Sequence, residues 1–526
     1  MNLREMREED IEPVIQLFRA NYGDDYAIPE FYDPQWVKRG IYSDNIIWLV
    51  IEEGGKILAS GAAVLDFGDY NDQIAEIGRL VVNPGESGRG LGRTLLNALV
   101  DASDERVEFA FGEARTTHIK TQRIFDHAGL APLGFLPMAY RMAWRESWVL
   151  SGQLFGNGRR LRQVGAAQIL PEVEPLARLA MANLELDEPL TVRADARAYP
   201  IDGQLAVEPL TGASLVRLLK IEQGRILEPE VFGGLHIDQG FSQLRAKKAT
   251  YLVANQDGAT LGAVGYMVDE SSRNVRIVEL IASDEAVKGS LLRHAVEQAE
   301  QVHEAEAIDC EVSAYSPRIQ RTLLDLGFLP AAYIPGMVFH NTSRWDVVKM
   351  MKLNVGWDLG QVELVDSSRR MYDLVTPAFI QADAQRQRQQ MAVGAPVLAG
   401  LSALEVDLVH RAGEELSPEA GAQLEMDALY IVLGGNLRAG ARLVGPRDCI
   451  GAGALLGQTP EGAATAGEGL RLLRLAPQGL AGLSDQHPRL GLKLYRNLAV
   501  CARRDVIAAT GSGSRASAAS GREPAG

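Results

Sequence analysis

The sequence predicts an α+β fold class, with two successive domains that each contain a mixed α/β sheet, followed by a β-roll and a C-terminal helix. Three observations lead to this prediction. An order of helix, hairpin, strand, helix and strand occurs near the N-terminus, the same order recurs in the middle of the chain, and short apolar runs broken by glycine precede a helical stretch near the C-terminus. The length of 526 residues suits three or four domains.

The overall composition excludes several classes of protein. With 46% hydrophobic and 23% charged residues, the chain has the composition of a globular protein. It contains no apolar stretch long enough to span a membrane and no signal peptide, so we expect a cytoplasmic protein without a membrane partner. The formal net charge of -15 argues against a nucleic-acid partner. The cysteines and histidines show no metal-ligand spacing, so no metal is expected and the cysteines are interpreted as buried thiols.

The first predicted domain covers residues 1–145. Its first helix, over residues 9–20, has its apolar residues at helical spacing, and a hairpin around Gly54 and Gly55 follows. A Gly-rich turn then separates a strand from an amphipathic helix. The remaining predicted elements are strands over 77–82, 107–111 and 138–142 and helices over 91–100 and 120–127.

The second predicted domain covers residues 191–344 and follows a helical linker over 146–190. It repeats the order of the first domain: Gln122 and Gly129 align with Gln320 and Gly327, in both cases 198 residues further along. The second copy is shorter between its third strand and the next helix, where the first copy has its Gly-rich turn. We interpret the pattern as a structural duplication, with chance similarity of two α+β domains as the alternative.

A second helical linker is predicted over residues 345–401, and a third domain over 402–505. Short apolar runs predict a small β-roll, and the helical spacing from Leu480 to Ala502 predicts a helix after it. Residues 506–526 contain mainly Gly, Ser and Ala, which predicts a disordered tail.

The Gly-rich turn is the strongest candidate for a ligand site. Glycines between Gly85 and Gly92 let the backbone approach a ligand closely, and free amides at the start of the following helix attract an anion of phosphate size. Arg89 and Arg93 add positive charge. The alternative is a tight strand-to-helix connection without a ligand.

Residues 1–142 resemble the GNAT acyltransferase family. The run Ser87-Gly88-Arg89-Gly90-Leu91-Gly92 after Val82-Asn83-Pro84 matches both glycines of that family's motif, with Ser87 in place of the usual Gln or Arg. The resemblance implies that residues 87–93 bind the pyrophosphate of acetyl-CoA. It also implies that the acyl carbonyl lies near Leu80, Val81 and Val82, where a β-bulge frees a backbone amide.

The same resemblance suggests residues for the proton transfers. Glu76, at the start of the strand before the turn, is the candidate general base, with a solvent-exposed carboxylate as the alternative. His118 stands where the family has an Asn that contacts pantetheine, and is a candidate for catalysis or cofactor binding, or a helix cap. Phe125 replaces the tyrosine that commonly acts as the acid. Tyr140 is the substitute candidate, unless the thiolate leaves unaided.

The other two domains resemble non-catalytic relatives. In the second domain, Asp284 and Glu285 stand at the place of the turn and would repel a pyrophosphate, so we expect a GNAT-like domain without CoA binding. Residues 402–505 resemble the cyclic-nucleotide-binding domain, whose last helix is a dimerising helix, which suggests a homodimer. Ala452, and Glu461 or Gly462, replace the residues that normally hold the ribose and the phosphate, so cyclic nucleotide binding is not expected.

Two functions remain open at this stage. The first is an acyl-CoA-dependent N-acyltransferase that acts on a small-molecule amine or a protein lysine, with regulation by the third domain. The second is a non-catalytic protein that senses acetyl-CoA.

Overall fold

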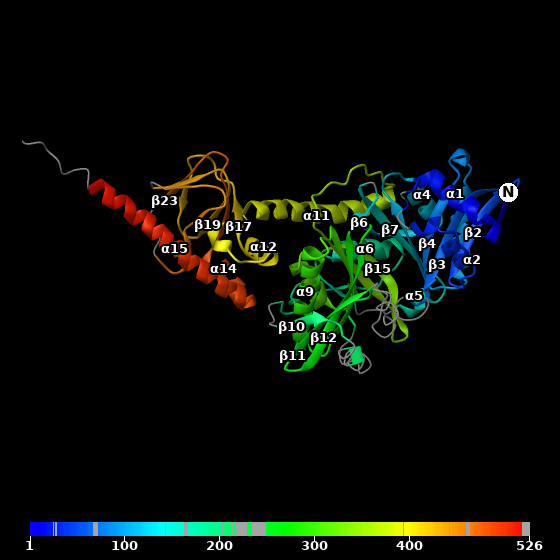
Figure 1. Cartoon of the computed structure of the whole chain (residues 1–526), viewed down its shortest axis with the longest axis horizontal. Helices are drawn as coiled ribbons and strands as arrows, with labels where there is room; N and C mark the ends of the chain where they lie inside the picture. The colour runs from blue at the N-terminus through cyan, green and yellow to red at the C-terminus, as the bar shows by residue number, and fades with distance from the viewer. Residues whose placement is uncertain are drawn as a thin grey trace, which may run out of the picture. The chain divides into compact units, whose positions relative to one another are not determined.

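The computed structural model describes residues 1–24, 26, 29–66, 72–142, 144–162, 167–201, 205–211, 215–216, 229–233, 249–392, 394–440, 442–458 and 463–517. The chain forms two compact units, Met1–Phe379 and Ile380–Gly526. Figure 1 shows their elements along the chain.

The first half of unit 1 is a seven-stranded mixed sheet with helices on both faces. Its strands run in the order β1-β2-β3-β4-β5-β7-β6, and β4 and β5 are parallel. Its elements are β1 (Asn2–Glu5), α1 (Ile11–Tyr22), α2 (Pro34–Ile41), β2 (Ile46–Glu53), β3 (Lys56–Asp66), β4 (Ile74–Val82), α3 (Leu91–Asp104), β5 (Phe109–Arg115), α4 (Lys120–His127), β6 (Ala131–Arg141) and β7 (Arg145–Leu154).

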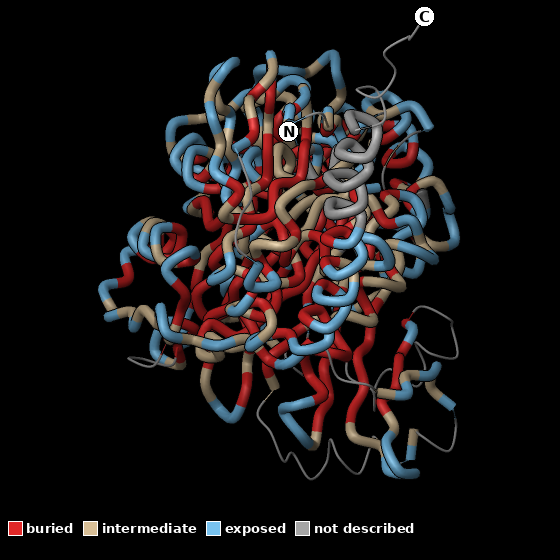
Figure 2. The backbone as a smooth tube through the Cα atoms, turned by 90° about the vertical axis from the view of Figure 1, so that its left-hand side faces the viewer, coloured by how far each residue is buried: buried red, intermediate tan, exposed pale blue. Residues whose placement is uncertain are grey.

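Two apolar clusters hold the helices to this sheet. Val14 and Phe18 of α1 pack with Val37 of α2 on one face, and Leu95 and Leu99 of α3 pack on the other. The alternation of side chains along a strand explains the division, because successive residues point to opposite faces. The buried positions follow the strands as continuous tracks in Figure 2.

The second half of unit 1 repeats this strand order as β10-β11-β12-β13-β14-β16-β15. Its elements are β10 (Ala206–Pro209), β11 (Thr250–Gln256), β12 (Ala259–Asp269), β13 (Asn274–Ala282), α9 (Lys288–Gln301), β14 (Ala307–Ser313), α10 (Pro317–Asp325), β15 (Leu329–His340) and β16 (Ser343–Leu353). Before it come α5 (Gly158–Leu161), β8 (Gln168–Ile169), α6 (Glu174–Asn183) and β9 (Thr191–Val192).

The two halves join into one 14-stranded sheet through β6 and β15. Gly134 pairs there with Ala332, the residue 198 positions further along. A Cβ on Gly134 would lie 2.3 Å from the Cβ of Ala332, so the junction requires glycine. The offset equals that of the sequence repeat, so the two halves meet at equivalent positions.

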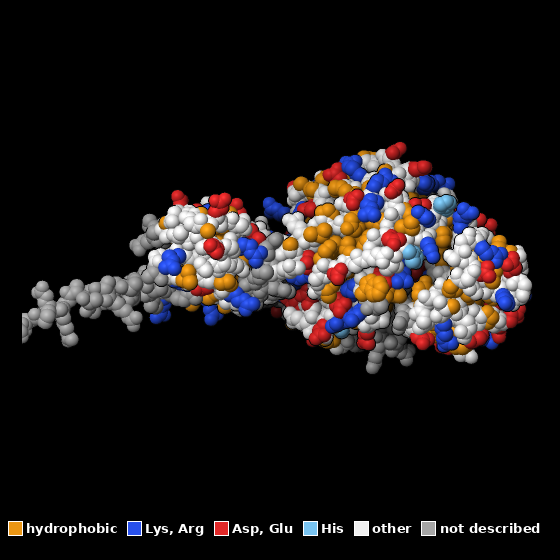
Figure 3. All heavy atoms as spheres, turned by 90° about the horizontal axis from the view of Figure 1, so that it is seen from above, with side chains coloured by type: hydrophobic (Ala, Val, Ile, Leu, Met, Phe, Trp, Pro, Cys, Tyr) orange, Lys and Arg blue, Asp and Glu red, His pale blue; other side chains and the backbone are white. Residues whose placement is uncertain are grey.

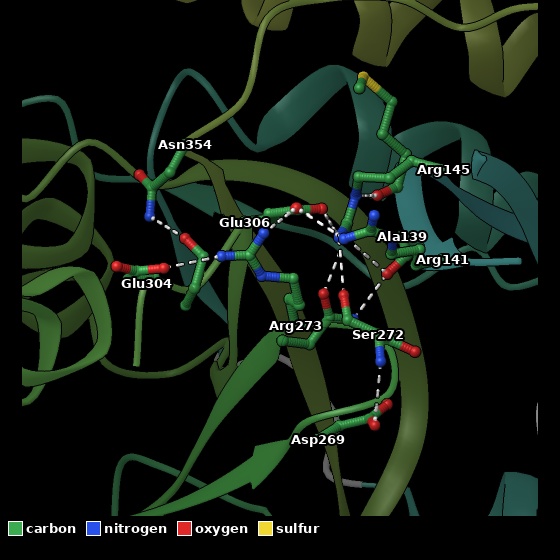
Figure 4. Close-up of polar contacts among 12 residues, drawn as sticks. Ala139, Arg141, Arg145, Asp269, Ser272, Arg273, Glu304, Glu306 and Asn354 are labelled. Carbon is green, nitrogen blue, oxygen red and sulfur yellow. Dashed lines mark hydrogen bonds and ion pairs between the residues drawn. The ribbon is translucent and has the colours of Figure 1, made fainter. Parts of the chain in front are cut away.

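Side chains near the ends of β6 and β7 also tie the halves together. The Arg145 guanidinium donates from Nη1 to the Ser272 carbonyl at 2.8 Å and from Nη2 to Asn274 Oδ1 at 2.8 Å. Glu306 pairs with both Arg141 and Arg145 at 3.1 Å. Figure 4 shows Arg141, Arg145 and Arg273 converging on Glu306 from the two halves.

Both predicted helical linkers need correction at their N-terminal ends. Residues 146–154 belong to β7, and residues 345–353 belong to β16. β7 lies between β5 and β6, and β16 between β14 and β15, so these strands are completed by pairing with distant segments. The polar and apolar residues of Arg145–Leu154 do not alternate clearly, so periodicity alone missed the strand. A helix does form further on, as α11 (Asp366–Ala392).

Unit 2 contains two four-stranded antiparallel sheets, β17-β24-β19-β22 and β18-β23-β20-β21. The helix α15 runs to Ser517, so the predicted disordered tail from residue 506 is wrong as far as Ser517. Extending a formed helix costs little per residue, and alanines favour it. The elements are α12 (Ala403–Ala412), β17 (Glu414–Leu416), β18 (Gln423–Glu425), β19 (Leu429–Gly434), β20 (Leu437–Ala439), β21 (Arg442–Val444), β22 (Cys449–Ile450), α13 (Ala452–Leu455), β23 (Ala463–Ala466), β24 (Arg471–Leu475), α14 (Pro477–Gln486) and α15 (Pro488–Ser517).

Candidate active site

The strands β4 and β5 separate in the middle of the first half. Their parallel pairing covers Ile74, Ala75 and Glu76 on β4 and ends opposite Phe111 on β5. The residues from Ile77 onward on β4 and from Gly112 onward on β5 do not pair with each other. Backbone groups on the facing edges are therefore available to a ligand that enters between the strands.

A β-bulge lies on β4 just beyond this point. Ser60 pairs with Val81 and Ala62 pairs with Gly78, so Arg79 and Leu80 together oppose Gly61. Arg79 has a φ of 54°, in the left-handed region. A bulge of this kind turns backbone groups out of the ladder. It lies at Arg79 and Leu80, at the N-terminal edge of the predicted segment 80–82.

The Gly-rich turn leads from β4 into α3 and is open. Gly88 and Gly90 have φ values of +88° and +76°, which favour glycine. No atom lies within 4 Å of a Cβ built on Gly88. The Asn83 side chain accepts a hydrogen bond from the Gly85 amide at 3.0 Å and shapes the start of the turn. The turn that leads into α3 thus leaves open space beside Gly88, as an anion site requires.

The two arginines of the turn differ in their contacts. Arg89 donates to Glu86 at 2.6 Å and to Glu53 at 2.9 Å, so its charge is already paired. Arg93 lies in the first turn of α3, and its guanidinium is 4.0 Å from a Cβ built on Gly90. Together with the exposed Ser87, Arg93 is the side chain placed to meet an anion here.

Glu76 lies on the sheet face covered by α1 and α2, and its carboxylate already has an ion-pair partner. Its carboxylate forms an ion pair with Arg79 Nη1 at 3.1 Å, and its side chain is 47% exposed. The carboxylate thus faces solvent and contacts Arg79 in the same half.

Glu113 is a candidate that the sequence reasoning missed. It follows Phe111 by two positions on β5, so both side chains point to the same face. Burial raises the pKa of Glu113, against the opposing charges of Lys349 and Arg276 from the second half and a hydrogen bond with Tyr140. A carboxylate between apolar residues in the separating strand was the available signal.

Tyr140 comes from β6 and meets this carboxylate. Burial raises the pKa of Tyr140 well above its ordinary value, and the charge of Glu113 raises it further. The phenol therefore stays protonated at neutral pH. The structure brings Glu76, Glu113 and Tyr140 to one face of the sheet, so the predicted residue Tyr140 joins a carboxylate other than the predicted base.

His118 has a different set of neighbours. Burial lowers its pKa, and the charges acting on it are those of Arg115, Lys120 and Glu363. Its Nδ1 is buried without a hydrogen-bond partner among the described residues. His118 is thus a neutral imidazole beside α4, and it is not grouped with Glu113 and Tyr140.

Phe125 is part of the core. It is 1% exposed, and a Cβ on Gly112 would lie 2.6 Å from its ring. Its ring thus packs directly against β5 beside the separating strands, where it offers no proton.

The comparisons with known proteins place the first half in a family. Residues 11–127 match the acetyltransferase (GNAT) family model. The chain carries a GNAT acetyltransferase domain at its N-terminus. The match begins at α1 and ends with α4, so it includes the bulge, the Gly-rich turn and Glu113.

Similar proteins match less than a third of the chain. Mycothiol acetyltransferase from Saccharopolyspora erythraea is 30% identical over 152 residues, which are 29% of this chain and 46% of that protein. The chain therefore matches less than half the length of this curated relative. Ribosomal-protein-S18-alanine N-acetyltransferase from Escherichia coli is 16% identical with a TM-score of 0.25, over 30% of this chain and 94% of that one. Salmonella typhimurium yncA, solved with its cofactor acetyl-CoA, is 15% identical with a TM-score of 0.27, over 30% and 94%.

In the second half, the cleft equivalent to that of the GNAT domain is filled by the chain itself. β13 and β14 also separate, after Ile277 and Cys310. The segment 229–233 lies between them: the Gly233 amide donates to the Val278 carbonyl at 2.8 Å, and the Phe232 amide donates to the Glu311 carbonyl at 2.9 Å. The Ser313 amide donates to the Glu230 carbonyl at 2.9 Å.

The start of α9, equivalent to the Gly-rich turn, is also covered. A Cβ on Gly289 would lie 2.4 Å from the Pro200 carbonyl oxygen. The buried Lys288 ammonium pairs with Glu230, which also accepts from the Tyr199 hydroxyl at 2.9 Å. The second half therefore has no open site equivalent to residues 87–93. The occlusion comes from backbone and from Glu230, whereas the sequence pointed only to Asp284 and Glu285.

In unit 2, the segment that contains Ala452 is close-packed. Ala452 is fully buried at the start of α13, and a Cβ on the preceding Gly451 would lie 2.2 Å from the Ala428 carbonyl oxygen. Glu461 and Gly462 lie outside the described residues. The segment at Gly451 and Ala452 is thus close-packed against β19 and offers no side-chain donor there.

Neither a membrane-spanning helix nor a metal-ligand cluster occurs among the described residues. No helix among them is long and apolar enough to cross a membrane. No cluster of three or more His, Cys, Asp or Glu side chains among them could hold a metal ion. On the face seen in Figure 3, acidic and basic side chains are interspersed.

Proposed function

We propose that the protein is an acetyl-CoA-dependent N-acetyltransferase with a single donor site, in its N-terminal GNAT domain. One observation carries the proposal. Among the described residues no segment bonds between the separated strands of the first half, and the turn at Gly88 is open, whereas in the second half the segment 229–233 lies between the strands and the Pro200 carbonyl covers the start of α9. A protein that used the fold only as a scaffold would have no need to keep one of the two clefts open.

The filled cleft suggests how the open one holds its ligand. Phe232 and Glu230 bond to the backbone of Glu311 and Ser313 in the second half. The equivalent groups 198 positions earlier are the Glu113 carbonyl and the Arg115 amide. These groups are suited to the amides of the pantetheine arm, while the amides at residues 88–92 and Arg93 meet the pyrophosphate.

Bound acetyl-CoA supplies an activated acetyl group. Glu113 accepts a proton from the acceptor ammonium, because its raised pKa makes it a stronger base than an exposed carboxylate. The amine nitrogen then forms the new bond to the acetyl carbon. Tyr140 donates its proton to the departing thiolate and recovers one from Glu113, with which it shares a hydrogen bond. The carboxylate of Glu113, ionised again, then takes the second proton from the nitrogen of the new amide and releases it to solvent. The backbone N–H groups freed by the bulge at Arg79 and Leu80 polarise the acetyl carbonyl.

The acceptor is proposed to be an amine of a small molecule or a protein lysine. Arg276 and Lys349 of the second half act on Glu113, so the second half forms part of the surroundings of the acceptor. We propose that this half is a GNAT-like domain that has lost CoA binding and now lines the acceptor side. Unit 2 is proposed to be a regulatory domain that does not bind cyclic nucleotides in the usual way.

The test combines binding and turnover on the full chain. Isothermal titration measures acetyl-CoA binding, and thiol release over a panel of small amines and lysine peptides measures transfer. Binding with amine-dependent thiol release and a matching acetylated product supports the enzyme. Absence of binding would refute the donor site and the enzyme together.

A non-catalytic acetyl-CoA sensor is the second candidate. The buried Phe125 favours it, because the family's usual proton donor is missing. Binding of acetyl-CoA without thiol release for any amine would support the sensor over the enzyme.

A further inference from the structure

Two buried cysteines of unit 2 lie side by side. Cys449 begins β22 and Cys501 lies in α15, 52 positions along the chain, and their Sγ atoms are 3.7 Å apart. Their exposed fractions are 0% and 1%. The chain therefore brings two sulfurs from distant segments into contact inside one compact unit.

The position of α15 near Cys449 is held by several contacts. Asn497, one turn before Cys501, donates from Nδ2 to the Val397 carbonyl at 2.9 Å and to the Ala399 carbonyl at 2.8 Å. Lys493 pairs with Glu405 at 2.7 Å. Leu498, which lies between Asn497 and Cys501, is also buried. Together these contacts hold the helix in its position along its axis and in its rotation about that axis.

The position of Cys449 is fixed as well. Cys449 pairs with Ile431 in the antiparallel ladder between β22 and β19, and its amide donates to Asp448 Oδ1 at 2.8 Å. Both sulfurs that make this contact therefore belong to elements held by hydrogen bonds, one to a strand and the other to a helix.

We propose that Cys449 and Cys501 form a reversible disulfide when the protein meets a hydroperoxide, so that this pair is a redox modification site in unit 2. A disulfide bond is about 2.05 Å long, so the sulfurs must approach by about 1.65 Å from their 3.7 Å separation. A small shift or rotamer change at α15 supplies this movement without rearrangement of the sheet.

The oxidation of the two thiols by a hydroperoxide takes two steps. One cysteine, as its thiolate, attacks the peroxide oxygen, giving a sulfenic acid and releasing the alcohol or water of the hydroperoxide. The second thiol displaces the hydroxyl, forming the S–S bond and releasing water. Two thiols are oxidised and one peroxide is reduced, and a dithiol reductant reverses the reaction.

The cross-link would join α15 covalently to the sheet that contains β22. It would close the chain between Cys449 and Cys501, and so restrict separation of α15 from the rest of unit 2. The expected readout is a rise of several degrees in the unfolding temperature of unit 2 after oxidation.

Cys310 provides the matched control. It is also buried, but it lies in β14 of unit 1, whereas the two sulfurs that lie 3.7 Å apart both belong to unit 2. The full-length protein is treated with hydrogen peroxide, alkylated, digested and analysed by mass spectrometry without reduction. We expect a peptide joining Cys449 to Cys501, with a mass about 2 Da below the sum of its two parts.

The variants separate the outcomes. Cys310→Ser should keep the cross-linked peptide and the shift in unfolding temperature, whereas Cys501→Ser should lose both. If Cys501→Ser does not fold, the peptide map of the unaltered protein still decides. Full alkylation of Cys449 and Cys501 after peroxide treatment, or a link that involves Cys310, would overturn the proposal.

Discussion

Arg145 and Arg344 make equivalent contacts on the two sides of the junction between the halves of unit 1. Each donates to a carbonyl of its own hairpin, Met138 or Met337, and each donates to a turn of the other half. Arg145 pairs with Glu306 and Arg344 pairs with Glu108, which differ by the repeat offset of 198. Burial lowers the pKa of both guanidinium groups. The repeat of strand order is therefore accompanied by equivalent bonds between the two halves.

This relationship predicts that unit 1 depends on both arginines. Arg344 is 0% exposed, so Arg344→Ala should lower the free energy of unfolding by about 3–5 kcal/mol, because Glu108 and several carbonyls lose their partner. Arg145→Ala should act similarly. Urea unfolding of the full chain measures both. Arg178→Ala, which removes an exposed pair with Glu174, is the control and should cost at most about 0.5 kcal/mol. Equal effects in the three variants would contradict the prediction.

Gly90→Glu should abolish donor binding. The side chain would fill the open turn and add a negative charge, so acetyl-CoA affinity should fall at least about 100-fold, or ~2.8 kcal/mol. Gly258→Glu is the matched control, since its φ of +77° equals that of Gly90 within a degree and its surroundings are also open. Both variants should lose similar thermal stability, but only Gly90→Glu should lose binding in isothermal titration. Retained affinity would refute the site.

Glu113→Gln should separate binding from chemistry. We expect kcat to fall about 100-fold or more, because the carboxylate that acts as the base is lost. The acetyl-CoA affinity should be unchanged, because the backbone carbonyl of residue 113, proposed to meet the pantetheine arm, remains. Glu76→Gln should cost less than about tenfold, because Glu76 is exposed and paired with Arg79. The reverse order of the two effects would return the role of base to Glu76.

The pH dependence follows from the raised pKa of Glu113. Only the ionised carboxylate accepts a proton, so kcat/KM should rise with pH through a value above the ordinary ~4.3 of glutamate. The raised pKa also means that protonated Glu113 stabilises the fold at low pH and that this contribution is lost as pH rises through the folded pKa. Unfolding measured across this range should therefore show Glu113→Gln gaining stability relative to the unaltered protein at the higher pH.

Titration of the full chain should show one molecule of acetyl-CoA bound per chain. The segment 229–233 and the carbonyl of Pro200 occupy the second cleft, and displacing them would break buried backbone hydrogen bonds. A stoichiometry of two in isothermal titration would show that the filled cleft opens. Loss of all binding in Gly90→Glu would assign the single site to the first half.

Part of the site could be read directly from residue order. Gly88, Gly90 and the strand before them are local features, because a positive φ and a helix start depend on neighbouring residues. Glu113 could not be found in this way. Its raised pKa comes from burial, and the charges of Lys349 and Arg276, which lie more than a hundred positions away, act in the opposite direction. Periodicity contains no information on such contacts.

The sequence by itself determined the α+β class, the repeat and the position of the Gly-rich turn, since these follow from apolar spacing and glycine conformation. Only the tertiary structure decided which cleft is open. Gly289 and Lys288 would permit a helix start like that of α3, but Pro200 and Glu230, from the segments before and after β10, cover it. Long-range packing thus leaves the first half as the proposed donor site.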